Sequence, residues 1–306
     1  NAAMVSVVVT ETSPSGHELP HMETRFYRRR PAGWQRTEPI IAFWGRKAKL
    51  KTDTLTFDYF ELDRPFVERV AEPIDSFHYA LRRLLGLPEL TASERITIVV
   101  APNYVPPGET LPDGSIIEPS PILHFVAADE DKNGSLYGDA DSSFYLRLRS
   151  QLIERSVMES RVVYGVTRER GSLPKQIESW LYDHAADLPS LLYGEPQRDE
   201  KVSVVPAHAV EILTGDEVNT SRSLGNVEYA TQSTTFSTHA LFDFLVADRG
   251  PEAISALLAA MSTHENWPGV LDAAFGLSME ELQAEWEVYI LAPRYSPQTI
   301  MHRPLR

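Results

Sequence analysis

One stretch of the sequence decides the fold, Phe66-Val-Glu-Arg-Val-Ala-Glu-Pro-Ile-Asp-Ser-Phe-His-Tyr-Ala-Leu-Arg-Arg-Leu-Leu-Gly86. Its apolar residues recur at spacings of three and four, which places them on one face of a helix. We therefore expect a helix from about Arg64 to Leu85. Gly86 follows at the position where a glycine commonly ends a helix, and Pro73 is expected to kink the middle.

Shorter apolar and β-branched runs, bounded by glycine and proline, predict strands on both sides of this helix. The expected strands cover residues 5–10, 23–30, 34–37, 54–60, 96–101 and 122–127. Before the last of them, residues 102–121 are rich in proline and predict a long surface loop. Further helices are expected near 144–164, 174–188, 228–248, 251–262, 268–275 and 278–291, the last beginning with the capping-box pattern Ser278-Met-Glu-Glu281.

The order of these elements, strands with one helix and then several helices, is typical of an α+β fold rather than of alternating β-α units. Asn1 and Ala2 are interpreted as the remnant of a cleaved tag. The expected parts are an N-terminal β hairpin segment at 1–50 and a larger domain at 51–306, with a sheet-containing part at 51–143, a helical part at 144–292 and a C-terminal tail at 293–306.

The composition excludes several classes of function. The 306-residue chain carries 29 Lys and Arg against 43 Asp and Glu, a net charge of −14, so no nucleic acid is expected as a partner. An anionic membrane surface would repel the same charge, and no apolar run in the sequence is long enough to span a bilayer. Because the sequence has no cysteine, disulfides, thiolate metal ligands and cysteine nucleophiles are excluded.

Two apparent metal motifs are interpreted as chance matches. His17-Glu-Leu-Pro-His21 fits the H-E-x-x-H zinc-peptidase pattern, which works only on a helix, where both imidazoles lie on one face. Pro20 would disrupt such a helix, and the preceding Ser13-Pro-Ser-Gly16 indicates a turn, so we expect a hairpin loop. The acidic stretch 129–141 lacks the terminal glutamate of a calcium loop in register and is expected to be solvated.

Three segments share a pattern with known proteins: Arg82-Arg-Leu-Leu-Gly-Leu-Pro88, Trp180-Leu-Tyr-Asp-His-Ala-Ala-Asp187, and Phe275-Gly-Leu-Ser278 continuing to Trp286. In this order they resemble the peptidase MA-like (gluzincin-type metallopeptidase) domains of bacterial extracytoplasmic proteins. The first is similar to the end of the helix before a sheet strand, the second to the segment with the third zinc ligand, and the third to the closing helix. The resemblance covers about residues 52–292 and implies a zincin-like mixed sheet with helices, followed by a mostly helical C-terminal half.

The sequence departs from that family at the residues that would bind zinc. The family's active-site helix should read apolar-His-Glu-x-x-His, and the best frame here is Leu152-Ile-Glu-Arg-Ser-Val157. Glu154 matches the general base, but Ile153 and Val157 replace both histidine ligands, and Asp183 stands at the position of the glutamate ligand. Because aliphatic side chains cannot coordinate zinc, we expect no metal, no cofactor and no zinc-activated water.

Glu154, Asp183 and His184 are therefore vestigial candidates for catalytic residues, and together with Trp180 they are the expected walls of a ligand cleft. Each also has a plainer interpretation. Glu154 would be a surface glutamate paired with an arginine, and Asp183 with His184 would be a satisfied structural pair.

The leading hypothesis is a non-catalytic metallopeptidase-like domain, a pseudoenzyme that binds a peptide or protein, or senses the cell envelope, through this cleft. One alternative is an active metallopeptidase with relocated ligands, using His184, His239 and a carboxylate. His239 and Asp243 lie four apart on an expected helix and could hold a metal together, although two ligands are rarely enough. A third hypothesis is a purely structural scaffold domain.

The N-terminal segment carries a second resemblance. Phe26-Tyr-Arg-Arg-Arg-Pro-Ala-Gly-Trp-Gln-Arg-Thr37 is similar to the last hairpin of a cystatin-like or ketosteroid-isomerase-like cone. In similar multidomain proteins this element precedes a peptidase MA-like domain, and some of them carry a membrane segment and an anti-sigma-like module. The resemblance implies an extracytoplasmic location, in the cell envelope or secreted, with any membrane tether in a region that precedes this sequence.

Overall fold

The computed structural model describes residues 1–12, 18–103, 109–126, 140–166, 173–184 and 239–291. The fold is α+β, as expected, with two sheets in the N-terminal half and helices in the C-terminal half. The chain divides into two compact units, one made of residues 1–79 and 89–152 and the other of residues 80–88 and 153–306. The boundaries expected at residues 50 and 143 both lie within the first unit.

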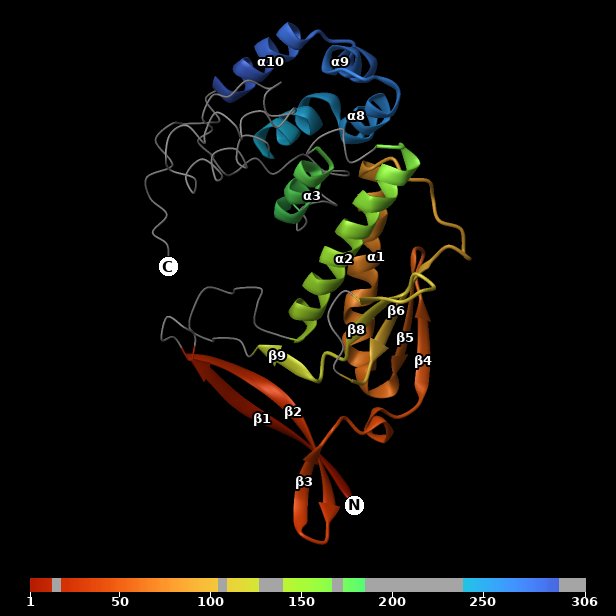
Figure 1. The fold of residues 1–306 in the computed structure, drawn as a ribbon, viewed down its shortest axis with the longest axis vertical. Coiled ribbons are helices and arrows are strands. Elements are labelled where there is room, and N and C mark those ends of the chain that lie inside the picture. Colours follow the sequence, from red (N-terminus) through yellow and green to blue (C-terminus); the bar gives the residue numbers. More distant parts are fainter. Residues whose placement is uncertain (13–17, 104–108, 127–139, 167–172, 185–238, 292–306) are drawn as a thin grey trace. The chain divides into compact units, whose positions relative to one another are not determined.

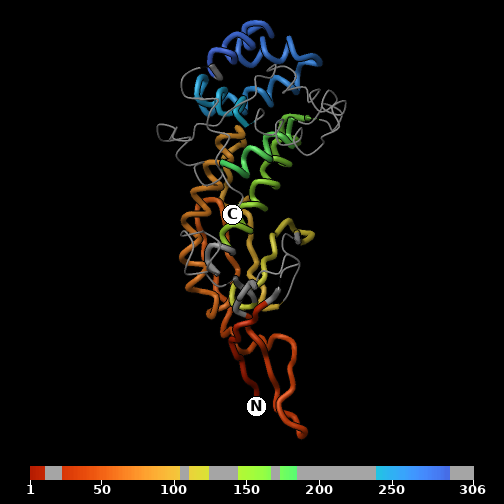
Figure 2. The backbone as a smooth tube through the Cα atoms, turned by 90° about the vertical axis from the view of Figure 1, so that its left-hand side faces the viewer, coloured from red at the N-terminus to blue at the C-terminus, as the bar shows by residue number. Residues whose placement is uncertain are grey.

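The first sheet is built on a long hairpin, which Figure 2 traces from the N-terminus. Its strands are β1 (Ala2–Thr12), β2 (Glu18–Arg30), β3 (Gly33–Thr37) and β9 (His124–Val126), with β1 on one side of β2 and β3 and β9 on the other. Ala2 pairs with Arg28, and the Asn1 carbonyl accepts a hydrogen bond from the Arg29 N–H at 3.1 Å. The two residues interpreted as a tag remnant therefore take part in the sheet.

The second sheet is mixed and has the order β4 (Lys47–Lys51), β5 (Leu55–Phe60), β6 (Ile96–Ala101), β8 (Ile116–Pro119) and β7 (Glu109–Thr110). Strands β5, β6 and β8 are parallel, and both outer strands are antiparallel to their neighbours. The expectation of a continuous surface loop over 102–121 is wrong, because β7 and β8 lie within it. Strand β8 has only four residues and lies in this proline-rich stretch, so its pattern could not be recognised in the sequence. Its first residue, Ile116, is buried.

Helix α1 (Arg64–Leu84) joins β5 to β6 as the spacing of its apolar residues predicts (Figure 1). The helix runs through Pro73 and ends as expected, because Gly86 has a φ of +60°. The Leu87 N–H donates to the Arg82 carbonyl at 2.9 Å, which closes the last turn. A Cβ atom on residue 86 would lie 2.4 Å from the Tyr164 hydroxyl, so only glycine fits there.

The remaining helices agree with the expected positions to within a few residues wherever the structure describes them, whereas residues 185–188 and 228–238 of two expected helices lie outside the described residues. The described helices are α2 (Ala140–Val163), α3 (Leu173–His184), residues 239–249, α8 (Glu252–Thr263), α9 (Trp267–Phe275) and α10 (Met279–Leu291). The predicted capping box is confirmed, because the Glu281 N–H donates to Ser278 Oγ and the Ser278 N–H donates to the Glu281 carboxylate, at 3.1 and 2.8 Å. In the described part of the chain, no helix is long and apolar enough to cross a bilayer.

A buried carboxyl group lies at the start of α1. Asp63 is fully buried, and its Oδ1 accepts a hydrogen bond from the Ser120 hydroxyl at 2.5 Å. Ser120 Oγ in turn accepts from the Trp44 indole N–H at 3.2 Å. Burial raises the pKa of Asp63 to about 7 against the opposing effect of these hydrogen bonds, because a charge is costly in an apolar environment.

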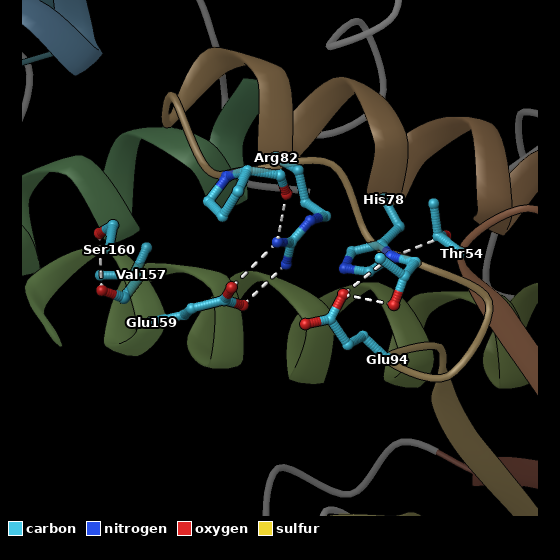
Figure 3. A network of polar contacts seen from close by, with 9 residues as sticks. Thr54, His78, Arg82, Glu94, Val157, Glu159 and Ser160 are labelled. Atoms are coloured by element: carbon cyan, nitrogen blue, oxygen red, sulfur yellow. Dashed lines mark hydrogen bonds and ion pairs between the residues drawn. The ribbon is translucent and has the colours of Figure 1, made fainter. Parts of the chain in front are cut away.

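Polar networks anchor α1 at two levels, as Figure 3 shows. In the first unit, the Thr54 hydroxyl donates to Asp75 at 2.7 Å and lies 2.8 Å from His78 Nδ1. In the second unit, the buried Arg82 guanidinium donates to both carboxylate oxygens of Glu159 at 2.7 and 2.9 Å. It also donates to the Pro88 carbonyl at 2.7 Å. This bidentate pair neutralises a cation that would otherwise be buried alone.

We expect the stability of the chain to fall as pH rises between about 4 and 7 because of Asp63. The folded state holds this proton up to about pH 7, whereas an unfolded aspartate releases it near 3.8. The folded state therefore binds more protons across that window, and the loss is about 1.4 kcal/mol per unit of pKa difference. Urea unfolding from pH 4 to 8 should show a flatter profile for Asp63→Asn, and an unchanged one for the exposed Asp53→Asn would be the control. Equal slopes for all three proteins would contradict this assignment.

Removing Glu159 should destabilise the second unit, because Arg82 would be left buried without its counter-charge. Breaking a buried pair costs roughly 3–5 kcal/mol, and the partial exposure of Glu159 reduces this to about 2–3 kcal/mol for Glu159→Ala. The matched control is Glu68→Ala, which breaks an exposed i,i+4 pair with Arg64 and should cost less than about 0.5 kcal/mol. Similar urea midpoints for the two variants would show that the Arg82 pair adds no stability.

Candidate functional site

The described part of the H-E-x-x-H match at residues 17–21 lies on a strand and not on a helix. Residues 18–21 belong to strand β2, where they pair with β1, and His17 lies outside the described residues. In a strand, positions four apart are about 13 Å from each other, so the helical geometry that the motif requires is missing. The strand begins earlier than expected, but the interpretation as a chance match is retained. Most of the acidic stretch 129–141 also lies outside the described residues.

Residues 152–157, which align with the zinc-binding helix of the family that the sequence resembles, lie on α2. The side chains at both histidine positions are packed in the interior. Ile153 and Val157 are 0% and 3% exposed. Glu154, between them in sequence, is exposed, and its Oε1 accepts a hydrogen bond from the Tyr182 hydroxyl at 3.1 Å. The residues present therefore do not fit a zinc ion, because neither buried side chain has a donor atom.

The acidic group around Glu154 extends to α3. Partial burial, together with the charge of Glu154, raises the pKa of Glu178 above its ordinary value. The same two effects raise the pKa of Tyr182, whose hydroxyl is already hydrogen-bonded to Glu154. Both shifts favour the protonated forms, so Tyr182 acts as a hydrogen-bond donor to Glu154 throughout the neutral pH range.

Trp180 lies in the interior rather than on a surface. Its side chain is fully buried, and its indole N–H donates to Asp243 Oδ1 at 2.9 Å. The ring stacks on the His184 imidazole with 5.0 Å between their centres. A side chain held in this way anchors α3 to residues 239–249 and cannot form the wall of an open cleft.

Asp183 and His184, adjacent in sequence, each contact a side chain of residues 239–249 through an imidazole and a carboxylate. His239 Nδ1 lies 2.9 Å from Asp183 Oδ2, and His184 Nε2 lies 3.1 Å from Asp243 Oδ1. The two imidazole rings meet edge to face, with their centres 6.3 Å apart. The structure thus brings together Trp180 and these four residues.

This cluster does not have the geometry of a metal site. Among the described residues, no three histidine, aspartate or glutamate side chains converge closely enough to hold a metal ion. Each imidazole is instead directed at a separate carboxylate. The alternative of a metallopeptidase with ligands relocated to His184 and His239 is therefore not supported by the described residues.

The surroundings of the two histidines shift their pKa values in opposite directions. His184 Nδ1 faces the Trp180 carbonyl at 3.0 Å and Nε2 faces the Asp243 carboxylate, so both nitrogens must donate. Burial opposes this charge, but the hydrogen bond and the charge of Asp243 outweigh it and raise the pKa of His184. In contrast, burial lowers the pKa of His239, with a further contribution from the charge of His184, despite the opposing effect of Asp183.

Sequence reasoning missed Ser179, which completes the cluster. Ser179 is exposed, and its hydroxyl lies 3.2 Å from His239 Nε2, the ring nitrogen that does not face Asp183. A signal was present in the spacing, because Ser179 and Asp183 lie four apart on α3, as His239 and Asp243 do on the other helix. Nothing in the sequence, however, predicted that Ser179 would contact His239, 60 residues further along the chain.

A surface pocket of about 390 Å³ lies elsewhere, in the first unit. Arg25 of β2 and Arg36 of β3 line it, and both form ion pairs with Glu23. The neighbouring Glu23 carboxylate therefore neutralises much of their charge. None of the residues expected to form the site lies in this pocket.

Comparisons with known proteins do not assign the chain to a group. No family model matches the sequence, and no curated protein or solved structure is significantly similar to it. The peptidase MA-like and cystatin-like resemblances therefore rest on the short segments that suggested them. The structure adds that Trp180–His184 and Ser278–Trp286 belong to helices or their caps.

Proposed function

We propose that the chain is a metallopeptidase-like domain without zinc chemistry, which binds an extended peptide or a segment of another protein. The observation that carries the first part is the burial of Ile153 and Val157 at both positions where the related frame requires imidazoles. Glu154, the counterpart of the general base, is engaged by Tyr182. Without a metal to polarise water, this carboxylate has no nucleophile to activate.

The sheet edges support a binding mode by strand addition. Strand β1 has β2 as its neighbour on one side, and in the described part of the chain its other edge is unpaired. Residues 2–10 carry no charged side chain, and Met4, Val5 and Val8 are exposed. An edge of this kind offers backbone donors and acceptors to an extended peptide.

Strand β4, an edge strand of the second sheet, differs from β1 because its edge is protected against pairing. Strand β4 has lysines at alternate positions, Lys47, Lys49 and Lys51, and Lys49 pairs with Asp58 at 2.8 Å. Lysines on an edge strand discourage further pairing because their charges would have to be desolvated. Since β4 has this protection and β1 does not, β1 is the edge that we propose for ligand binding.

We further propose an extracytoplasmic location, which rests on the sequence resemblance. A peptide-binding domain of a membrane-anchored signalling protein would fit both the resemblance and an unprotected strand edge. The expected association with an anti-sigma-like module has the same basis.

The purified chain should neither bind zinc stoichiometrically nor hydrolyse peptides. Calorimetric titration with zinc chloride and an assay with a quenched fluorescent peptide library would measure both. We expect no saturable zinc binding at micromolar concentration and no cleavage that chelators abolish, because Ile153 and Val157 cannot coordinate the ion. Stoichiometric zinc together with chelator-sensitive cleavage that Glu154→Gln removes would overturn this part of the proposal.

An extended peptide should bind to the β1 edge. The probe is a labelled peptide of alternating Val and Thr with lysines at both ends, measured by fluorescence anisotropy. Val8 is 68% exposed, and Val8→Lys should weaken binding by about tenfold or more, because a charge would have to be buried in the new pairing.

Two controls separate strand addition from general stickiness. The same substitution at Val162, 79% exposed on α2, should leave the affinity unchanged. A peptide methylated on alternate backbone nitrogens keeps its side chains but loses the donors of one edge, so it should not bind. If no peptide binds, or if both lysine variants weaken binding equally, the scaffold hypothesis gains support instead.

A further inference from the structure

Three side chains in the second unit form a continuous line of hydrogen-bonding groups. The Ser179 hydroxyl lies 3.2 Å from His239 Nε2, and His239 Nδ1 lies 2.9 Å from Asp183 Oδ2. Ser179 and Asp183 are one helical turn apart on α3, so both reach the same imidazole, which belongs to residues 239–249. The order is hydroxyl, imidazole, carboxylate.

The chemistry of the groups fixes where the protons lie. A carboxylate can only accept, so His239 Nδ1 carries the hydrogen that faces Asp183. In the neutral ring, Nε2 then has a free lone pair and accepts from the Ser179 hydroxyl. Burial lowers the pKa of His239, which keeps this neutral form dominant near pH 7. This is the tautomer that a general base needs in order to deprotonate a serine.

The second histidine of the cluster has the opposite pKa shift. Both nitrogens of His184 face acceptors, and the ring centre of His184 lies 6.3 Å from that of His239. Two neighbouring imidazoles whose pKa values are shifted in opposite directions are an arrangement found where acid and base roles are divided between similar groups. His239 is 7% exposed, whereas Ser179 is exposed, so a small reagent can reach the hydroxyl.

We propose that Ser179 is a nucleophile, activated by His239 and with Asp183 as the positioning residue, that reacts with activated acyl esters. Ser179 Oγ forms a bond to the acyl carbon while its proton passes to His239 Nε2. The bond from carbon to the leaving oxygen breaks, and the proton is transferred to that oxygen. A water molecule then releases the acid by the same proton relay, so that ester and water give acid and alcohol.

The position of Ser179 restricts the substrate class. It lies in the interior of α3, where backbone N–H groups are committed to the helix and cannot stabilise an oxyanion. Both nitrogens of His184 are also engaged, by the Trp180 carbonyl and Asp243, so the developing charge has no strong donor and only esters with good leaving groups, such as aryl esters, are expected to react. This inference does not rest on the proposed peptide binding at β1, which involves other residues, and either can fail without the other.

The test uses the full chain with a fluorophosphonate probe and with p-nitrophenyl acetate. The probe should form one adduct per chain, in which Ser179 Oγ is bonded to phosphorus and fluoride has left, and peptide mass spectrometry locates it. Ser179→Ala should abolish the adduct and the ester hydrolysis above background. His239→Gln should lower the hydrolysis rate by about 10²–10⁴-fold, the usual contribution of a general base.

The variant Asp183→Asn tests whether Asp183 positions and polarises His239 or only supports the fold, because only the first role affects the pH–rate profile. Asp183 is 63% exposed, so its replacement should leave the fold intact, as circular dichroism would show. Burial sets the low pKa of His239, and the Asp183 charge partly opposes it, with Asp243 and His184 as the other charged neighbours. Removing Asp183 should therefore lower the rate and shift the acid limb of the pH–rate profile to lower pH.

The control is Ser262→Ala on α8, because Ser262 is also exposed but its hydroxyl donates to the Ala259 carbonyl instead of an imidazole. This variant should label and hydrolyse as the original chain does. The proposal is overturned if folded protein forms no adduct at Ser179, if Ser262 is labelled equally, or if Asp183→Asn leaves both the rate and the pH profile unchanged.

Discussion

The bidentate contact between Arg82 and Glu159 is the interaction on which the second unit depends. Arg82 is buried at the last turn of α1, and the same guanidinium holds the Pro88 carbonyl just beyond that turn. The contact therefore fixes the end of one helix, the following turn and the C-terminal half of α2 with a single charged group. An unmatched cation in the interior is unfavourable, so a packing that separated Arg82 from Glu159 would be penalised.

The same rule, that buried charges need partners, shapes the candidate site. Two carboxylates and two imidazoles form contacts between α3 and residues 239–249, so that each imidazole nitrogen that faces a carboxylate meets one from the other helix. Trp180 adds a further link between the two helices, because its indole N–H donates to Asp243. This reciprocity holds two segments together that are far apart in sequence, and it leaves one imidazole neutral with its lone pair directed at an exposed serine.

Local features of the fold could be predicted from the sequence, and features that depend on distant pairing could not. The α1 helix with its glycine end, strand β6 and the Ser278 capping box follow from spacing and from residues within one or two turns. Strand β8 was missed because its four residues gain their order from β6 rather than from their own pattern. For the site, the residue types at 180–184 and 239–243 were recognisable, but nothing in the sequence showed which histidine would meet which aspartate, or that Ser179 would join them.

The unguarded β1 edge also has a consequence for the behaviour of the chain in solution. A net charge of −14 keeps copies of the chain apart through long-range repulsion. That repulsion is screened within about 8 Å at physiological ionic strength, whereas pairing of uncharged strand backbones is barely affected by salt. Colloidal stability is therefore governed by ionic strength, and concentrated, salty solutions favour edge-to-edge assembly of β1 strands into ordered aggregates.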